Sequence, residues 1–146
     1  MPMKKKAKRL MMPSKRKKRL PKALQTDQLE ALLNAPNLAK PEGIRDRALM
    51  ELVYGAGLRV SEACGLTFAE LDLDSASLRV TGKRGKTRWV PLPAMTIPWL
   101  EKYIVESRPH LTQKPVAEIF LNAHGRALSR SMAYRVLAVS YTHLRA

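Results

Sequence analysis

Residues 78–92 read LRVTGKRGKTRWVPL, two runs of alternating apolar and polar side chains on either side of the turn sequence GKRGK at 82–86. A period of two is typical of half-buried strands, and two such runs joined through glycines predict a β-hairpin. The sequence LDL at 71–73 alternates in the same way and predicts a further strand. The middle of the chain is therefore expected to form a small antiparallel sheet.

The sequence on both sides of this sheet has the apolar spacing of helices. The first helix is expected to begin at about 27, with Thr26 as its cap, and to end near 34–36. Ser61 is the expected cap of a short helix, and Ser129 or Ser131 that of the last helix. The intervening helices are expected at about 42–54, 61–65 and 94–107, and a short buried run at 119–121. The predicted fold class is α+β, mainly α, with a small antiparallel sheet set among helices.

Positive charge is concentrated at the N-terminus. The formal net charge is +15, yet residues 1–22 hold 11 of the 27 lysines and arginines and no acidic residue, so the remainder carries a net charge of only +4. Residues 1–20 are too charged to collapse and are expected to be a disordered basic tail. Such a tail binds phosphate backbones without reading base sequence; a nuclear address or a merely solvated tail is left open. The candidate DNA contacts in it are Lys15, Arg16, Lys17, Lys18 and Arg19.

Composition narrows the remaining classes. No run of 18 or more apolar residues is present, so no membrane partner is expected, and the charged N-terminus lacks the apolar block of a secretory signal. The single cysteine, Cys64, fits a reducing cytoplasm and is interpreted as a small buried residue rather than a reactive thiol. His110 and His124 are explained by loop solvation, and without a Cys/His cluster no zinc or other metal is expected.

Two basic residues occupy positions where a side chain can be presented to a phosphate. Arg59 lies between a glycine-containing bend and a short helix, where a rigid element can hold its two-pronged guanidinium. Lys83 lies at the tip of the hairpin, where a flexible ammonium can reach a ligand. Four further basic residues crowd the same hairpin and are candidate DNA contacts: Arg79, Arg84, Lys86 and Arg88.

The order of these segments resembles the tyrosine recombinase, or phage integrase, family. The run GLRVSEACGL at 57–66, the strand LD at 71–72 and the hairpin at 78–92 follow one another in the family's order and spacing. Xer-like and integron-type members are the most similar. The resemblance extends from about 20 to about 139 and implies a catalytic domain over 21–139.

The resemblance implies a DNA strand transferase that needs neither a metal nor another cofactor. In this family a tyrosine hydroxyl attacks a DNA phosphate, forms a 3′-phosphotyrosine and frees a 5′-hydroxyl, and the reverse attack reseals the strand. Arg59 matches the arginine that stabilises charge on the phosphate. Lys83 matches the lysine that acts as general acid, and Lys86 is a less specific second match. Glu62 is expected simply to pair with Arg59. Double-stranded DNA and other recombinase protomers are the implied partners.

The family pattern also requires a His-x-x-Arg box, a second His or Trp and the tyrosine nucleophile, none of which this sequence matches in the expected order. Residues 140–146 contain Tyr141 and His143 at the wrong place and spacing, and are expected not to be native to the fold. We therefore expect a DNA-binding fragment that does not cleave DNA alone. A basic nucleic-acid-binding module without chemistry, or a regulatory partner of a complete recombinase, is the alternative.

Overall fold

The computed structural model describes residues 25–145, apart from the side chains of Lys83 and of residues 139–145. Its elements, in chain order, are helices α2 (Thr26–Leu33) and α3 (Pro41–Met50), the π-helical turn η2 (Glu51–Gly55), helix α4 (Val60–Cys64), the turn η3 (Phe68–Glu70), strands β1 (Leu71–Asp72) and β2 (Ser77–Thr81), the turn η4 (Lys83–Gly85), strand β3 (Thr87–Pro91), helix α5 (Thr96–Lys102), the π-helical turn η5 (Tyr103–Ser107), and helices α6 (Arg108–Leu111) and α7 (Arg130–Arg145). The predicted class, mainly helical with a small antiparallel sheet, is confirmed.

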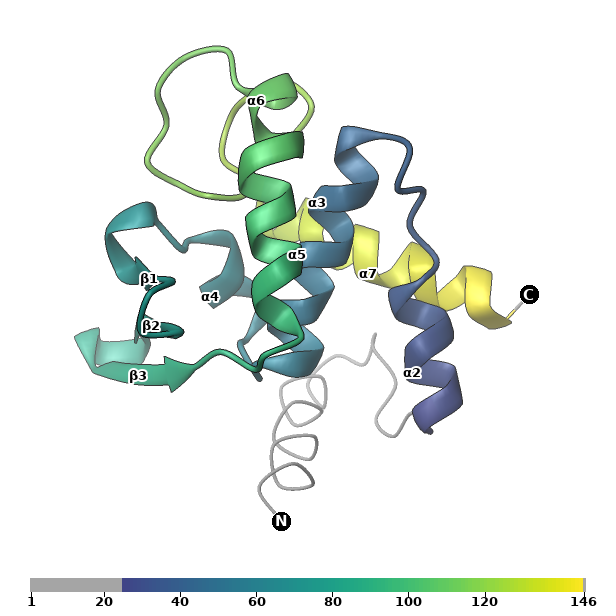
Figure 1. Ribbon diagram of the computed structural model, residues 1–146, viewed down its shortest axis with the longest axis horizontal. Helices are drawn as coiled ribbons and strands as arrows, with labels where there is room; N and C mark the ends of the chain where they lie inside the picture. Colours follow the sequence, from purple (N-terminus) through teal and green to yellow (C-terminus); the bar gives the residue numbers. More distant parts are fainter. Residues whose placement is uncertain (1–24, 146) are drawn as a thin grey trace.

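Two long helical segments form the centre of the domain (Figure 1). Segment α3–η2 packs antiparallel to segment α5–η5–α6. At one end Ser107 donates a hydrogen bond to the Pro41 carbonyl, and at the other end Thr96 donates one to the Glu51 carboxylate. Helix α7 packs against α4, α2 and α3. The three-stranded sheet lies to one side of these helices, and α2 lies on the other (Figure 1).

The sheet has the order β1-β2-β3, and each neighbouring pair is antiparallel. In the hairpin, Leu78 pairs with Val90, Arg79 with Trp89, and Val80 with Arg88. Paired residues share a face, and faces alternate along each strand. Leu78, Val80 and Val90 are buried, so the face that carries them and Arg88 is turned toward the helices. Arg79 and Trp89 lie on the opposite, exposed face.

An aromatic pair and three arginine hydrogen bonds hold the segment before α7 against the helices. Tyr103 and Phe120 are fully buried and stack with ring centroids 5.1 Å apart. The Tyr103 hydroxyl donates to the Ile119 carbonyl at 2.9 Å and accepts from the Leu121 N–H at 3.0 Å. Arg108 donates to the carbonyls of Val116, Glu118 and Ile119. The buried run predicted at 119–121 is confirmed.

Three helix caps differ from the sequence expectation or select between alternatives. Helix α2 begins after Gln25, whose N–H donates to the Gln28 side chain at 3.0 Å, so Thr26 is not the cap. Helix α4 begins after Arg59, so Ser61 is not the cap either. Of the two expected alternatives for the last helix, the structure selects Ser129 over Ser131, because the Ser129 hydroxyl accepts the Met132 N–H at 3.1 Å.

The helices also extend beyond two expected ends. The helix expected at 94–107 continues through η5 and α6 to Leu111. Helix α7 runs without a break from Arg130 to Arg145, so residues 140–145, which we expected to be atypical, continue the helix. That residues 140–146 are foreign to the fold stays a prediction. The basic tail lies outside the described residues.

Among residues 25–145 no helix is both long and apolar enough to cross a membrane. The described side chains also contain no group of three or more His, Cys, Asp or Glu residues that could hold a metal ion.

Candidate nucleic-acid interface

Arg59 is held at the start of helix α4 with an exposed side chain. Its backbone is extended (φ −74°, ψ 152°), and its N–H donates to Glu62 Oε1 at 2.9 Å. Gly57, two residues earlier, has a φ of 82°, a left-handed conformation that glycine adopts without strain. No ion pair occupies the Arg59 guanidinium within the described part of the chain. The bend therefore presents an exposed guanidinium on a backbone that Glu62 holds in place.

Glu62 differs from its predicted role. We expected its carboxylate to pair with the Arg59 side chain, but it accepts the Arg59 backbone N–H instead. Its ion pair is with Arg88 of β3, whose Nη1 and Nη2 donate to Oε2 and Oε1 at 3.0 and 3.1 Å. This is the bidentate geometry that gives arginine–carboxylate pairs their strength and their fixed orientation.

The Glu62 carboxylate is almost enclosed, whereas Arg88 is half-exposed, with side-chain exposures of 6% and 47%. Burial alone would raise the pKa of Glu62, but the hydrogen bonds from Arg88 and from the Arg59 N–H outweigh it, and the pKa is lowered. The same pair raises the pKa of Arg88. Both groups are therefore charged at neutral pH.

The tip of the hairpin lies beside this carboxylate. A Cβ built on Gly82 would lie 3.7 Å from Glu62 Oε2 and 3.9 Å from Arg88 Nη1, so Gly82 faces the pair across about the width of one methyl group. Lys83 follows directly in η4. One carboxylate thus accepts the backbone N–H of Arg59 on one side and binds Arg88 of the hairpin on the other, where Gly82, the residue before Lys83, faces it. The segments that carry the two predicted catalytic residues are neighbours.

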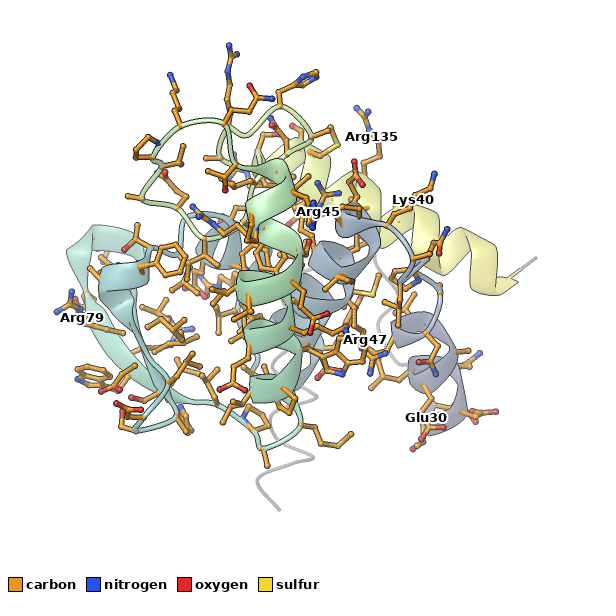
Figure 2. All side chains as sticks on the ribbon, turned by 45° about the horizontal axis from the view of Figure 1, so that its top comes forward. Glu30, Lys40, Arg45, Arg47, Arg79 and Arg135 are labelled. Atoms are coloured by element: carbon orange, nitrogen blue, oxygen red, sulfur yellow. The ribbon has the colours of Figure 1, made fainter. Side chains whose placement is uncertain are left out.

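The turn itself has a tight, left-handed backbone. The Gly82 N–H donates to the Lys86 carbonyl at 2.7 Å, and Arg84 and Gly85 have φ values of 62° and 71°. Arg84 and Lys86 are both exposed. Arg79 is also exposed, but it lies on the outer face of the sheet, away from the helices, where Figure 2 shows it at the edge of the molecule.

The five hairpin residues predicted to contact DNA or phosphate are therefore not equivalent. Lys83, Arg84 and Lys86 belong to the tip, Arg79 lies on the outer face, and Arg88 lies on the inner face with its guanidinium on Glu62. Sequence reasoning missed the Glu62–Arg88 pair. The available signal was the strand alternation, which puts Arg88 on the same face as buried Val90.

Cys64 is buried at the end of α4, and its thiol donates weakly to the Ser129 carbonyl at 3.8 Å. Burial raises its pKa to about 11, and the nearby charge of Arg130 only partly opposes this. The interpretation of Cys64 as a structural residue is confirmed by its burial.

Known proteins share both the sequence and the shape of this arrangement. Residues 22–143 match the sequence pattern of the phage integrase family. The tyrosine recombinase XerD of Lacticaseibacillus casei is 43% identical over 125 residues, which are 84% of this chain and 42% of that protein. XerD of Xanthomonas axonopodis pv. citri is 46% identical over 125 residues, 81% of this chain and 41% of that protein.

A crystal structure of the XerH site-specific recombinase bound to its difH substrate superposes with a TM-score of 0.70 at 26% identity, over 87% of this chain and 38% of that one. The chain thus spans about two fifths of the length of these relatives. Because the family's sequence pattern covers 22–143 and includes both the Arg59 bend and the Lys83 hairpin, the chain belongs to the phage integrase family, with Xer tyrosine recombinases among its relatives.

Proposed function

We propose that this chain carries the first half of the phosphate-binding site of a site-specific DNA recombinase, with Arg59 and Lys83 directed at one DNA phosphate. The observation that carries the proposal is the position of the Glu62 carboxylate, which accepts the Arg59 backbone N–H at 2.9 Å, binds Arg88 of the hairpin and is faced by Gly82, the residue before Lys83. Family membership supplies the class of reaction.

Each of the two residues has a role that fits its setting. Arg59 has a fixed backbone and an exposed guanidinium, and two parallel N–H donors suit the nonbridging oxygens of a phosphate. In the transition state these oxygens gain charge, and a preorganised cation there lowers the barrier. Lys83 belongs to a turn, from which an ammonium can follow the departing 5′-oxygen and protonate it. Neither role requires a metal or another cofactor.

The surrounding basic residues would bind the DNA backbone on either side of that phosphate. Arg84 and Lys86 follow Lys83 in the same turn sequence and are exposed, and we assign them to duplex DNA. Arg79 is assigned a more distant contact because it lies on the outer face of the sheet. The basic tail, with Lys15, Arg16, Lys17, Lys18 and Arg19, adds affinity that does not depend on base sequence.

The partners in this proposal are duplex DNA and other recombinase protomers, and the compartment is the cytoplasm. The XerH relative is bound to its difH substrate, and a lambda integrase structure of similar fold is a tetramer bound to a Holliday junction. The printed sequence contains no His-x-x-Arg box, so we expect DNA binding from this chain without strand cleavage.

Binding to a fluorescent 30-base-pair duplex tests the proposal through anisotropy at several salt concentrations. Arg59→Ala and Lys83→Ala should each weaken binding, and each should reduce the slope of log Kd against log salt by about 0.9 if one phosphate contact is lost. Lys40→Ala is the matched control, since Lys40 is exposed and lies on the side of the molecule away from the sheet (Figure 2).

Equal effects of Lys40→Ala and Arg59→Ala would contradict the assignment and favour a basic module that binds through overall charge. Deleting residues 1–19 should lower both the affinity and the salt dependence; unchanged values would exclude the tail as a contact. A nicked suicide substrate should trap no covalent adduct with this chain, and a trapped adduct would show that the chain contains a working nucleophile.

A further inference from the structure

Arg88 was predicted to contact DNA, but its surroundings give it a different task. It pairs with Val80 in the sheet, so its side chain leaves β3 on the face turned toward the helices. There it forms two hydrogen bonds, both to Glu62 and both between 3.0 and 3.1 Å. A guanidinium that donates two hydrogen bonds to one nearly enclosed carboxylate is held in that orientation by the ion pair.

Glu62 in turn has three hydrogen bonds, which join three segments. Oε1 accepts from the Arg59 N–H and from Arg88 Nη2, and Oε2 accepts from Arg88 Nη1 and faces Gly82. Two of these bonds run from β3 to α4, so they fix the distance between the hairpin and the Arg59 bend. Phosphate binding by Arg59 and Lys83 together requires that distance to be correct within a fraction of an ångström.

Charge gives the pair a second consequence. Glu62 is an anion beside the place where a DNA phosphate would bind, and unpaired it would repel that phosphate. Arg88 neutralises it, so the positive charges of Arg59 and Lys83 act on the ligand without an opposing neighbour.

From these observations we propose that Arg88 is a positioning residue that holds the Lys83 hairpin beside Arg59 through Glu62, and is not itself a DNA contact. The inference rests on the proposed function for its ligand, but the geometry of the free protein tests it separately. It assigns opposite behaviour to two basic residues that are two positions apart, Lys86 and Arg88.

The first measurement uses the protein without DNA. In Arg88→Gln, backbone amide ¹⁵N relaxation should show increased motion at Gly82 and Gly85, while Lys86→Gln should leave both amides as they are in the parent chain. If Arg88→Gln left the motion of the hairpin tip unchanged, the positioning role would be refuted. This arm does not depend on DNA binding and so remains decisive if the proposed function fails.

The second measurement is DNA affinity in a double-substitution series. Arg88→Gln should weaken duplex binding roughly three- to tenfold, because it both frees the hairpin and leaves Glu62 unpaired. Glu62→Gln combined with Arg88→Gln removes that unpaired charge and keeps an oxygen for the Arg59 N–H, but it leaves the hairpin free, so it should recover only the part of the affinity that the unpaired charge had cost and should keep the salt slope of the parent chain. A direct DNA contact behaves differently: the double variant would stay as weak as Arg88→Gln and would show a salt slope lower by about 0.9.

Should Arg88→Gln prove too unstable to study, the neutral double variant and Arg88→Lys replace it. Lysine retains the charge but cannot make both bonds in the same plane, so Arg88→Lys should bind DNA more tightly than Arg88→Gln and still show increased motion at Gly82. A lysine variant with the parent's motion and affinity would overturn the proposal. If the parent chain did not bind duplex DNA at all, the proposed function would be refuted, but the relaxation measurement would still test the positioning role of Arg88.

Discussion

Arg47 and Glu51 form an ion pair inside the helical layer, and replacing Arg47 by methionine tests how strongly this pair holds α2 and α5 to α3. Arg47 Nε lies 3.0 Å from Glu51 Oε2, and the side chains are only 10% and 6% exposed. Arg47 Nη1 also donates to the Leu33 carbonyl and to Asn34 Oδ1 at the end of α2, and the guanidinium stacks 4.1 Å from the Trp99 ring centroid.

Arg47→Met should lower the free energy of unfolding by about 3–5 kcal/mol, because it leaves a buried carboxylate without its counter-charge. That is a large part of the roughly 5–15 kcal/mol available to a domain of this kind. The same change at Lys102 is a matched control. Lys102 and Glu106 have the same i,i+4 spacing and an Nζ–Oε1 distance of 2.8 Å, but they are 38% and 57% exposed, and their loss should cost about 0.3–0.5 kcal/mol.

Urea unfolding followed by far-ultraviolet circular dichroism measures both variants. The double variant Arg47→Met with Glu51→Met should recover most of the loss, because no charge then remains buried. Equal costs for Arg47→Met and Lys102→Met, or a double variant no more stable than Arg47→Met, would refute this account of the helical layer.

Three further predictions concern two glycines, the Cys64 thiol and the Glu62–Arg88 pair. Gly85→Ala should lower the free energy of unfolding by about 1 kcal/mol, because alanine is strained at the left-handed φ of this open position. Gly125→Ala should lower it further, because its Cβ would also lie 2.8 Å from the Leu111 carbonyl oxygen. Thermal unfolding ranks the two variants, and equal losses of stability would be inconsistent with the packing at 125. Cys64 should react with a disulfide reagent at pH 8 only after the chain is unfolded in urea. A pKa of about 11 leaves on the order of one thousandth of the folded chain's thiol ionised at that pH. Rapid reaction of the folded chain would contradict the burial of Cys64. Since the pKa of Glu62 is lower in the folded chain, its pair with Arg88 should stabilise the fold above the ordinary carboxyl pKa, and this stability should be lost as pH falls through the lowered pKa. A Glu62→Gln chain should lack this part of the acid-induced loss of stability. Identical acid-unfolding profiles of the two chains would argue against the pair.

Much of the fold was predictable, because apolar spacing determines which face of each element is buried. The hairpin at 78–92 and the helix near 42–54 follow from that spacing. Cap residues were less predictable. At Gln25 and Arg59 the cap is made by the side chain three residues later, Gln28 or Glu62, which accepts the N–H of the capping residue, so the identity of the capping residue itself carries little information.

The predicted helix ends were wrong where contacts with neighbouring segments stabilise a helix beyond its local stop signal. Pro109 removes a backbone donor, which normally ends a helix just before it. Here the backbone widens into the π-helical turn Tyr103–Ser107 and continues through Leu111. Arg108 then uses its side chain on the carbonyls of the following loop, an interaction between segments that no local pattern encodes.

The sequence predicts which segments form the candidate site, but it does not predict the contacts between them. Arg59 and Lys83 were identified by their motifs, and the Glu62 carboxylate now links those motifs in space. Arg79 and Arg88 were both expected to contact DNA, although alternation along the strands puts them on opposite faces of the sheet. The partner of Arg88 lies 26 residues earlier in the chain, and only the folded structure identifies it.

Side-chain NMR of Arg59 and Lys83 during a titration with duplex DNA tests the central claim most directly. If both groups bind the same phosphate, the Arg59 Nε–H and Lys83 ammonium resonances should shift along one common isotherm, and Arg59→Ala should diminish the shift at Lys83. Separate isotherms, or a Lys83 response that is unaffected by Arg59→Ala, would contradict it.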